Sequence, residues 1–125
     1  MLPAEVVEKC RSGLGAAGLY ISVTSANPFH GLHAAVTRRP LDGDEPGWQP
    51  EQRMTRLEAV RSFTSWNAWA AGQDAELGSL EMGKRADLVV LSDDVLRCEE
   101  TRIKDVTPVM TMVGGAIAFE QKESR

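Results

Sequence analysis

Hydrophobic positions predict a short helix from about residue 28 to residue 38. Three apolar residues recur at the spacing of one helical face: Phe29, Leu32 and Val36. Asn27 suits the position that caps a helix start, and Pro28 suits the first turn, where its missing N–H is no loss. Pro40 disfavours helical geometry in the residue before it, so we expect the helix to end at Arg38 or Arg39.

A longer helical pattern follows. Thr55 and Glu58 have the spacing of a capping box, in which each side chain binds a free backbone N–H of the other residue. Five apolar residues then recur at near-helical spacing: Leu57, Val60, Phe63, Trp66 and Ala70. Gly72 suits the end of the helix, because glycine tolerates the left-handed backbone found there. We predict one helix over 55–71.

Beyond this helix the pattern changes to that of strands. A turn at 81–84 precedes the apolar run 86–91, which is short and rich in valine and leucine, as in a buried strand. Two further strand-like runs, 106–112 and 116–119, flank Gly114–Gly115, and this arrangement is typical of a β-hairpin.

The rest of the chain adds a short helix at 4–12, a strand at 19–23 and a loop at 40–50, which Trp48 is placed to hold. Helices thus come first and strands last. We predict an α+β fold in which N-terminal helices precede an antiparallel or mixed β-sheet.

Composition narrows the class of protein. The 125 residues are 42% hydrophobic and 26% charged, as in a soluble globular domain, and no apolar run approaches the roughly 20 residues that span a membrane. Without a signal-peptide pattern, the expected location is cytoplasmic. The net charge of −4 argues against a nucleic-acid partner. Cys10 and Cys98 form no CxxC pair, so we expect reduced thiols and no thiolate zinc site.

A motif extends from Gly78 to Leu91. Its sequence, GSLEMGKRADLVVL, combines a tight Gly-Lys turn with a strand and resembles a hallmark of the amidohydrolase superfamily, with Met82 in place of the usual proline. The upstream stretches NPFHGLHAAVTRRP, GWQPEQRMT and FTSWNAWAAG resemble amidohydrolase family 3, the group that includes N-substituted formamide deformylases. The resemblance covers residues 23–119, so we treat 23–125 as one amidohydrolase C-terminal-like region and 1–22 as a divergent segment.

This resemblance implies the end of a (β/α) barrel plus part of its β-sandwich, within proteins several times longer. The metal ligands of such enzymes come mostly from earlier strands. Tyr20 stands where the family has an aspartate that contacts metal and water, and a phenol with an ordinary pKa near ~10 is a poor base at neutral pH. We therefore expect no catalytic, metal-binding or cofactor-binding residue in the chain, and an N-terminus altered by truncation or frameshift.

Four residues are candidates for a ligand site. His30 and His33 lie three apart on the predicted helix, so their side chains could meet, although packing or a surface position explains both as well. Arg38 and Arg39 could bind an anion through their forked donors, yet cations are favoured at a helix C-terminus in any case.

Other polar and aromatic residues have structural interpretations. Asp87 is expected to cap a turn or pair locally, and Trp66 and Trp69 to be core or interface anchors. Asp93–Asp94 and Glu99–Glu100 are expected to form a solvated acidic face.

Two function hypotheses remain. In the first, the chain is a truncated amidohydrolase-like protein without hydrolase activity by itself, and it forms homo-oligomers because its strands have unpaired edges. In the alternative, a separate barrel-bearing polypeptide completes a metal-dependent hydrolase of non-peptide C–N bonds.

Overall fold

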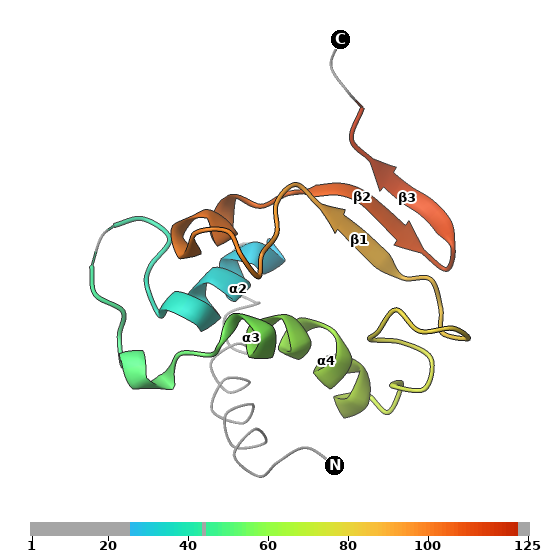
Figure 1. Ribbon diagram of the computed structural model, residues 1–125, viewed down its shortest axis with the longest axis horizontal. Helices are drawn as coiled ribbons and strands as arrows, with labels where there is room; N and C mark the ends of the chain where they lie inside the picture. Colours follow the sequence, from blue (N-terminus) through green and yellow to red (C-terminus); the bar gives the residue numbers. More distant parts are fainter. Residues whose placement is uncertain (1–25, 44, 123–125) are drawn as a thin grey trace.

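The computed structural model describes residues 26–43 and 45–122 (Figure 1). The expected helix at 4–12 and strand at 19–23 lie outside these residues, as do Cys10 and Tyr20. The described elements, in chain order, are α2 (Pro28–Thr37), η1 (Pro50–Gln52), α3 (Arg56–Phe63), α4 (Ser65–Ala70), β1 (Leu88–Leu91), η2 (Glu100–Asp105), β2 (Pro108–Val113) and β3 (Ala116–Glu120). Helices followed by a three-stranded antiparallel sheet confirm the α+β prediction.

Helix α2 begins and ends where its sequence signals predict. Asn27 Oδ1 accepts a hydrogen bond from the Phe29 backbone N–H at 3.0 Å, and Pro28 occupies the first turn. The helix ends at Thr37, one residue earlier than expected. Arg38 takes the left-handed conformation (φ 57°) and donates its N–H to the Ala34 carbonyl at 2.8 Å.

The predicted helix over 55–71 is wrong in one respect, because it is two helices. The capping box is present: Glu58 N–H donates to Thr55 Oγ1 at 3.3 Å, and Thr55 N–H donates to Glu58 Oε2 at 2.8 Å. The break lies at Thr64 (φ −127°, ψ −100°), whose hydroxyl donates to the Val60 carbonyl at 2.9 Å. Such hydroxyl bonds compete with the backbone ladder and bend helices. Gly72 (φ 68°) follows the end of α4, as predicted.

The sheet has the order β1-β2-β3, with both neighbouring pairs antiparallel. Gly114 (φ 57°) and Gly115 (φ 82°) join β2 to β3, which confirms the predicted hairpin. Positive φ at both central residues is the condition for a type I′ turn, whose twist matches that of the strands. Figure 1 shows that this hairpin extends beyond the helices.

One expectation about the sheet is wrong. The apolar run 86–91 forms a strand only over Leu88–Leu91, and the strand is not buried, since Val89 is 49% and Val90 43% exposed. A strand with one solvated face usually alternates apolar and polar residues, and this run does not. It has the composition of a buried strand, but no other element among the described residues covers it.

The core lies between α2, α3 and η2. Its buried members are Phe29, Leu32, Val36, Ala59, Ile103 and Val106. The short helix η2 was not predicted, yet Ile103 and Val106 are each only 2% exposed. Cys98 is a free thiol, half-buried beside this core.

The 40–50 loop is fastened to α2 by Trp48, as predicted. Its N–H donates to the Arg38 carbonyl at 3.0 Å, and the Arg38 guanidinium lies 5.3 Å from the centre of its ring. Gly47 passes so close to α2 that a Cβ there would lie 2.3 Å from the Thr37 carbonyl oxygen. At the other end of the loop, Lys104 Nζ of η2 donates to the Leu41 carbonyl.

Candidate functional site

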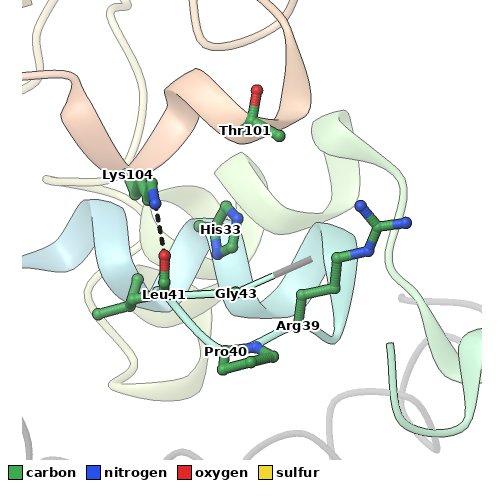
Figure 2. Close-up of a pocket in the computed structure, with 7 residues that line it drawn as sticks. All are labelled: His33, Arg39, Pro40, Leu41, Gly43, Thr101 and Lys104. Carbon is green, nitrogen blue, oxygen red and sulfur yellow. Dashed lines mark hydrogen bonds between the residues drawn. The ribbon is translucent and has the colours of Figure 1, made fainter. Parts of the chain in front are cut away.

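Two of the four candidate residues meet at one cavity. His33 and Arg39 line a hollow of about 260 Å³ between α2, the segment that follows it and η2 (Figure 2). The other lining residues are Pro40, Leu41, Gly43, Thr101 and Lys104. His30 and Arg38 do not line it.

His33 is the buried polar group of this cavity. It is only 4% exposed, and its Nδ1 has no hydrogen-bond partner. Burial lowers its pKa from the ordinary value of 6.5, and the charges of Lys104 and Arg39 add to this effect, whereas Asp105 opposes it. The imidazole is therefore neutral at neutral pH.

The cavity carries positive charge. Arg39 and Lys104 line it, and no carboxylate from the described part of the chain does. Arg39 holds its place through its backbone N–H, which donates to Thr37 Oγ1 at 3.1 Å, while its buried Nε has no partner. Lys104 donates one hydrogen bond to the Leu41 carbonyl, the dashed line in Figure 2. An ammonium group has three donors, so two remain for a ligand.

The remaining two candidates separate from the site. The Arg38 side chain contacts Trp48 instead. Its Nε donates a hydrogen bond to the Trp48 carbonyl at 3.2 Å, and its guanidinium group stacks on the Trp48 ring. His30 is half-buried, and its Nδ1 has no partner. Across residues 26–43 and 45–122, no three His, Cys, Asp or Glu side chains come together as a metal site would require.

Sequence reasoning missed Thr101 and Lys104. Both lie on η2, a six-residue 3₁₀ helix too short for a helical hydrophobic pattern, and η2 packs against α2 across more than 60 positions of the chain. The only local signal was the apolar pair Ile103 and Val106 beside them, whose burial fixes which way η2 faces.

A second, larger hollow of about 520 Å³ opens between α4, the segment after it and β1. Its apolar wall is formed by Phe63, Ala68, Leu77, Leu80, Leu88 and Val89. Trp66 and Trp69 do not line it. Trp66 is half-buried and Trp69 is 52% exposed, so neither is a core anchor, and a role at an interface stays a prediction.

The 78–91 motif combines a turn held by Lys84 with strand β1. Lys84 Nζ donates to the Asp74 carbonyl at 2.6 Å and to Ser79 Oγ at 2.8 Å, and it pairs with Glu81 at 3.0 Å. Hydrogen bonds from Lys84 and Ser79 lower the pKa of Glu81. Asp87 Oδ1 accepts from the Gly114 N–H at 2.6 Å, which confirms its expected structural role.

The acidic residues after β1 differ among themselves. Asp93 pairs with Arg102 at 2.9 Å and is half-buried, whereas Asp94 is exposed and lies 3.8 Å from Arg97. Glu99 and Glu100 are exposed, as expected of a solvated face.

The chain has an α+β fold. It contains three features that the sequence resemblance led us to expect: the turn at Lys84, the strand after it and the glycine hairpin. Comparison with known proteins agrees: the model of the Amidohydrolase family matches residues 21–119. The chain therefore belongs to amidohydrolase family 3.

Two curated relatives show how much of such a protein the chain represents. It is 32% identical over 114 residues to an N-substituted formamide deformylase of Arthrobacter pascens, covering 86% of this chain and 21% of that protein. It is 37% identical over 93 residues to Protein LONG AFTER FAR-RED 3 of Arabidopsis thaliana, covering 74% of this chain and 16% of that protein. The chain thus spans about a fifth of their length. No solved structure matches it.

The described helices are all too short or too polar to cross a lipid bilayer.

Proposed function

We propose that this chain is an amidohydrolase-like module that has no hydrolase activity by itself and associates with copies of itself. The observation that carries the proposal is its sheet, which is apolar on both faces and, in the part of the chain that the structure describes, open at both edges. Such a sheet is suited to binding other polypeptide rather than to facing water.

The strand register explains why both faces are apolar. Residues paired across an antiparallel sheet point to the same side. One side therefore carries Leu88 and Val90 with their partners Met112 and Met110. The other carries Val89 and, across the paired Thr111, Phe119. Val90 is 43% exposed, and Phe119 is 48% exposed.

The edges supply the second half of the argument. Strand β2 lies between the other two, so β1 and β3 are both edge strands among the described residues. Their outward N–H and C=O groups can pair with a strand from another copy. A homo-oligomer formed in this way would cover backbone and apolar side chains together.

The expected lack of catalysis rests on the chemistry of the side chains. Hydrolysis of a C–N bond by this family's type of mechanism needs a metal-activated water, and three or more ligands hold such a metal. The described residues bring no such set together. Metal analysis of the purified chain, followed by a hydrolysis screen against formamides and other amides, tests the proposal. Stoichiometric zinc together with turnover would overturn it.

The likeness to an N-substituted formamide deformylase favours one alternative. There, a second polypeptide supplies the metal ligands, and this chain completes a hydrolase of non-peptide C–N bonds. Co-expression with the reading frames that neighbour its gene separates the two proposals. A co-purifying barrel-bearing protein with amidase activity supports the alternative, and a pure homo-oligomer without activity supports the first.

A further inference from the structure

The cavity at His33 is lined by positive charge, and the proposed self-association through the sheet does not involve this cavity. Its lining combines two cations, Arg39 and Lys104, with a neutral imidazole and, among residues 26–43 and 45–122, with no carboxylate. Neither cation forms an ion pair with any described residue. Two unpaired like charges beside one hollow repel each other, and an anion in the hollow removes that cost.

Two buried nitrogens of residues that line the cavity also lack partners, as do His30 Nδ1 and Arg53 Nε outside it. Arg39 Nε and His33 Nδ1 are both inaccessible to solvent and form no hydrogen bond. Buried polar groups in proteins are almost always satisfied, so such a pair calls for an explanation. Arg39 presents a planar fork of donors, which fits the paired oxygens of a carboxylate or a phosphate.

We propose that this cavity binds a small oxyanion, a carboxylate or a phosphate, with Arg39 and Lys104 as the cationic ligands and His33 as the buried polar wall. Its volume of about 260 Å³ is several times the ~30 Å³ that one water takes up in the liquid, so such an anion fits. In the view of Figure 2 the His33 ring lies between the Lys104 ammonium group and the Arg39 side chain, whose guanidinium group points away from Lys104.

Two nearby acids, Asp105 and Asp42, do not line the cavity. Asp105 follows Lys104 in η2 and acts on His33 at a distance, but it does not line the cavity. Asp42 lies between two lining residues of the loop and is itself exposed. The charge that the described residues present to the hollow is therefore positive.

Calorimetric titration of the full chain with inorganic phosphate, and separately with acetate, tests the proposal. We expect saturable binding of one anion per chain, and the stronger of the two identifies the class of ligand. Arg39→Gln should weaken binding at least tenfold. Arg97→Gln is the matched control, because the Arg97 side chain is 88% exposed and lies outside the cavity. Its affinity should equal that of the unmodified chain.

A second readout follows His33 itself. Binding of an anion should raise the pKa of His33, measured by NMR, in the unmodified chain and not in Arg39→Gln. Lys104→Gln should also weaken binding, and circular dichroism shows whether that variant folds. Absence of saturable binding by either anion, or equal weakening in Arg97→Gln, would overturn the proposal. Because oligomeric state is measured independently, either outcome leaves the proposed self-association untouched.

Discussion

The Asp87 carboxylate accepts a hydrogen bond from the Gly114 N–H at 2.6 Å, across 27 positions of the chain. The bond joins the residue before β1 to the hairpin that links β2 and β3. One side chain therefore ties the start of β1 to the β2–β3 turn at the same end of the sheet.

Replacement of Asp87 with Ala should destabilise the protein by about 1 kcal/mol, because an exposed turn loses one charge-assisted hydrogen bond. Chemical denaturation measures this difference. Asp42→Ala is the control, since Asp42 is exposed and forms no hydrogen bond or ion pair with any described residue, and we expect a change within about 0.5 kcal/mol. Equal effects of the two substitutions would contradict the role of Asp87.

Gly78 should tolerate alanine much less well than Gly72 does. Both have positive φ, 89° and 68°, so both variants bear backbone strain of roughly 1–2 kcal/mol. A Cβ at Gly78 would also lie 2.6 Å from the Ala68 Cβ, whereas nothing lies within 4 Å at Gly72. We expect Gly78→Ala to cost about 2 kcal/mol more than Gly72→Ala in thermal or chemical unfolding. A difference near zero would mean that α4 moves away freely.

The two isoleucines offer a matched test of the core. Ile103 is 2% exposed on η2, and Ile117 is 55% exposed on β3. Truncation of Ile103 to Ala should cost about 2–5 kcal/mol, because it leaves a cavity between η2 and α2. Ile117→Ala should cost well under half as much. The free energy of unfolding of each variant, measured at low protein concentration, decides the matter.

Substitutions that place a positive charge on the exposed sheet should dissociate the proposed oligomer. Val90→Lys and Ile117→Lys each place an ammonium on an apolar face that is already partly solvated, so folding should be affected little. Light scattering coupled to gel filtration should show a shift to monomer. Arg61→Glu, an exposed change on α3, is the control and should leave the mass unchanged. A stable monomer in the unmodified chain would contradict self-association outright.

Acid should destabilise the fold through His33. The pKa of His33 is lowered in the folded chain, so the unfolded chain binds a proton more readily. The stability that depends on neutral His33 is present above 6.5 and is lost as pH falls from 6.5 toward the lowered folded value. Denaturation curves collected through this range should show a smaller loss in His33→Gln. An identical loss in that variant would assign the effect to other groups.

The parts of the fold that the sequence predicts are those with local causes. Asn27 and the Thr55–Glu58 pair cap helices through residues two or three positions away, and Gly114–Gly115 form a turn on their own. Each signal lies within a few residues of its effect, so one sequence is enough to recognise it.

The parts that were missed depend on distant contacts. The break at Thr64 accompanies the close approach of Gly78, whose added Cβ would lie 2.9 Å from the Ser65 Cα. Likewise, Arg39 joins Lys104 only because η2 packs against α2. Sequence spacing placed Arg38 and Arg39 together, but the left-handed turn at Arg38 sends one side chain to Trp48 and the other to the cavity.

Strand β1 carries apolar residues on both faces, and this affects how its register against β2 is fixed. In most sheets, a shift of a strand by one residue exposes its apolar side chains to water, and the free-energy cost of that exposure keeps the strand in register. Here Val89 and Val90 are nearly equivalent in that respect, so polarity alone does not oppose a slip of β1. The register of this sheet must instead be set by two local features. The Gly114–Gly115 turn sets the pairing of β2 with β3, and the hydrogen bond from that turn to Asp87 sets the position of β1.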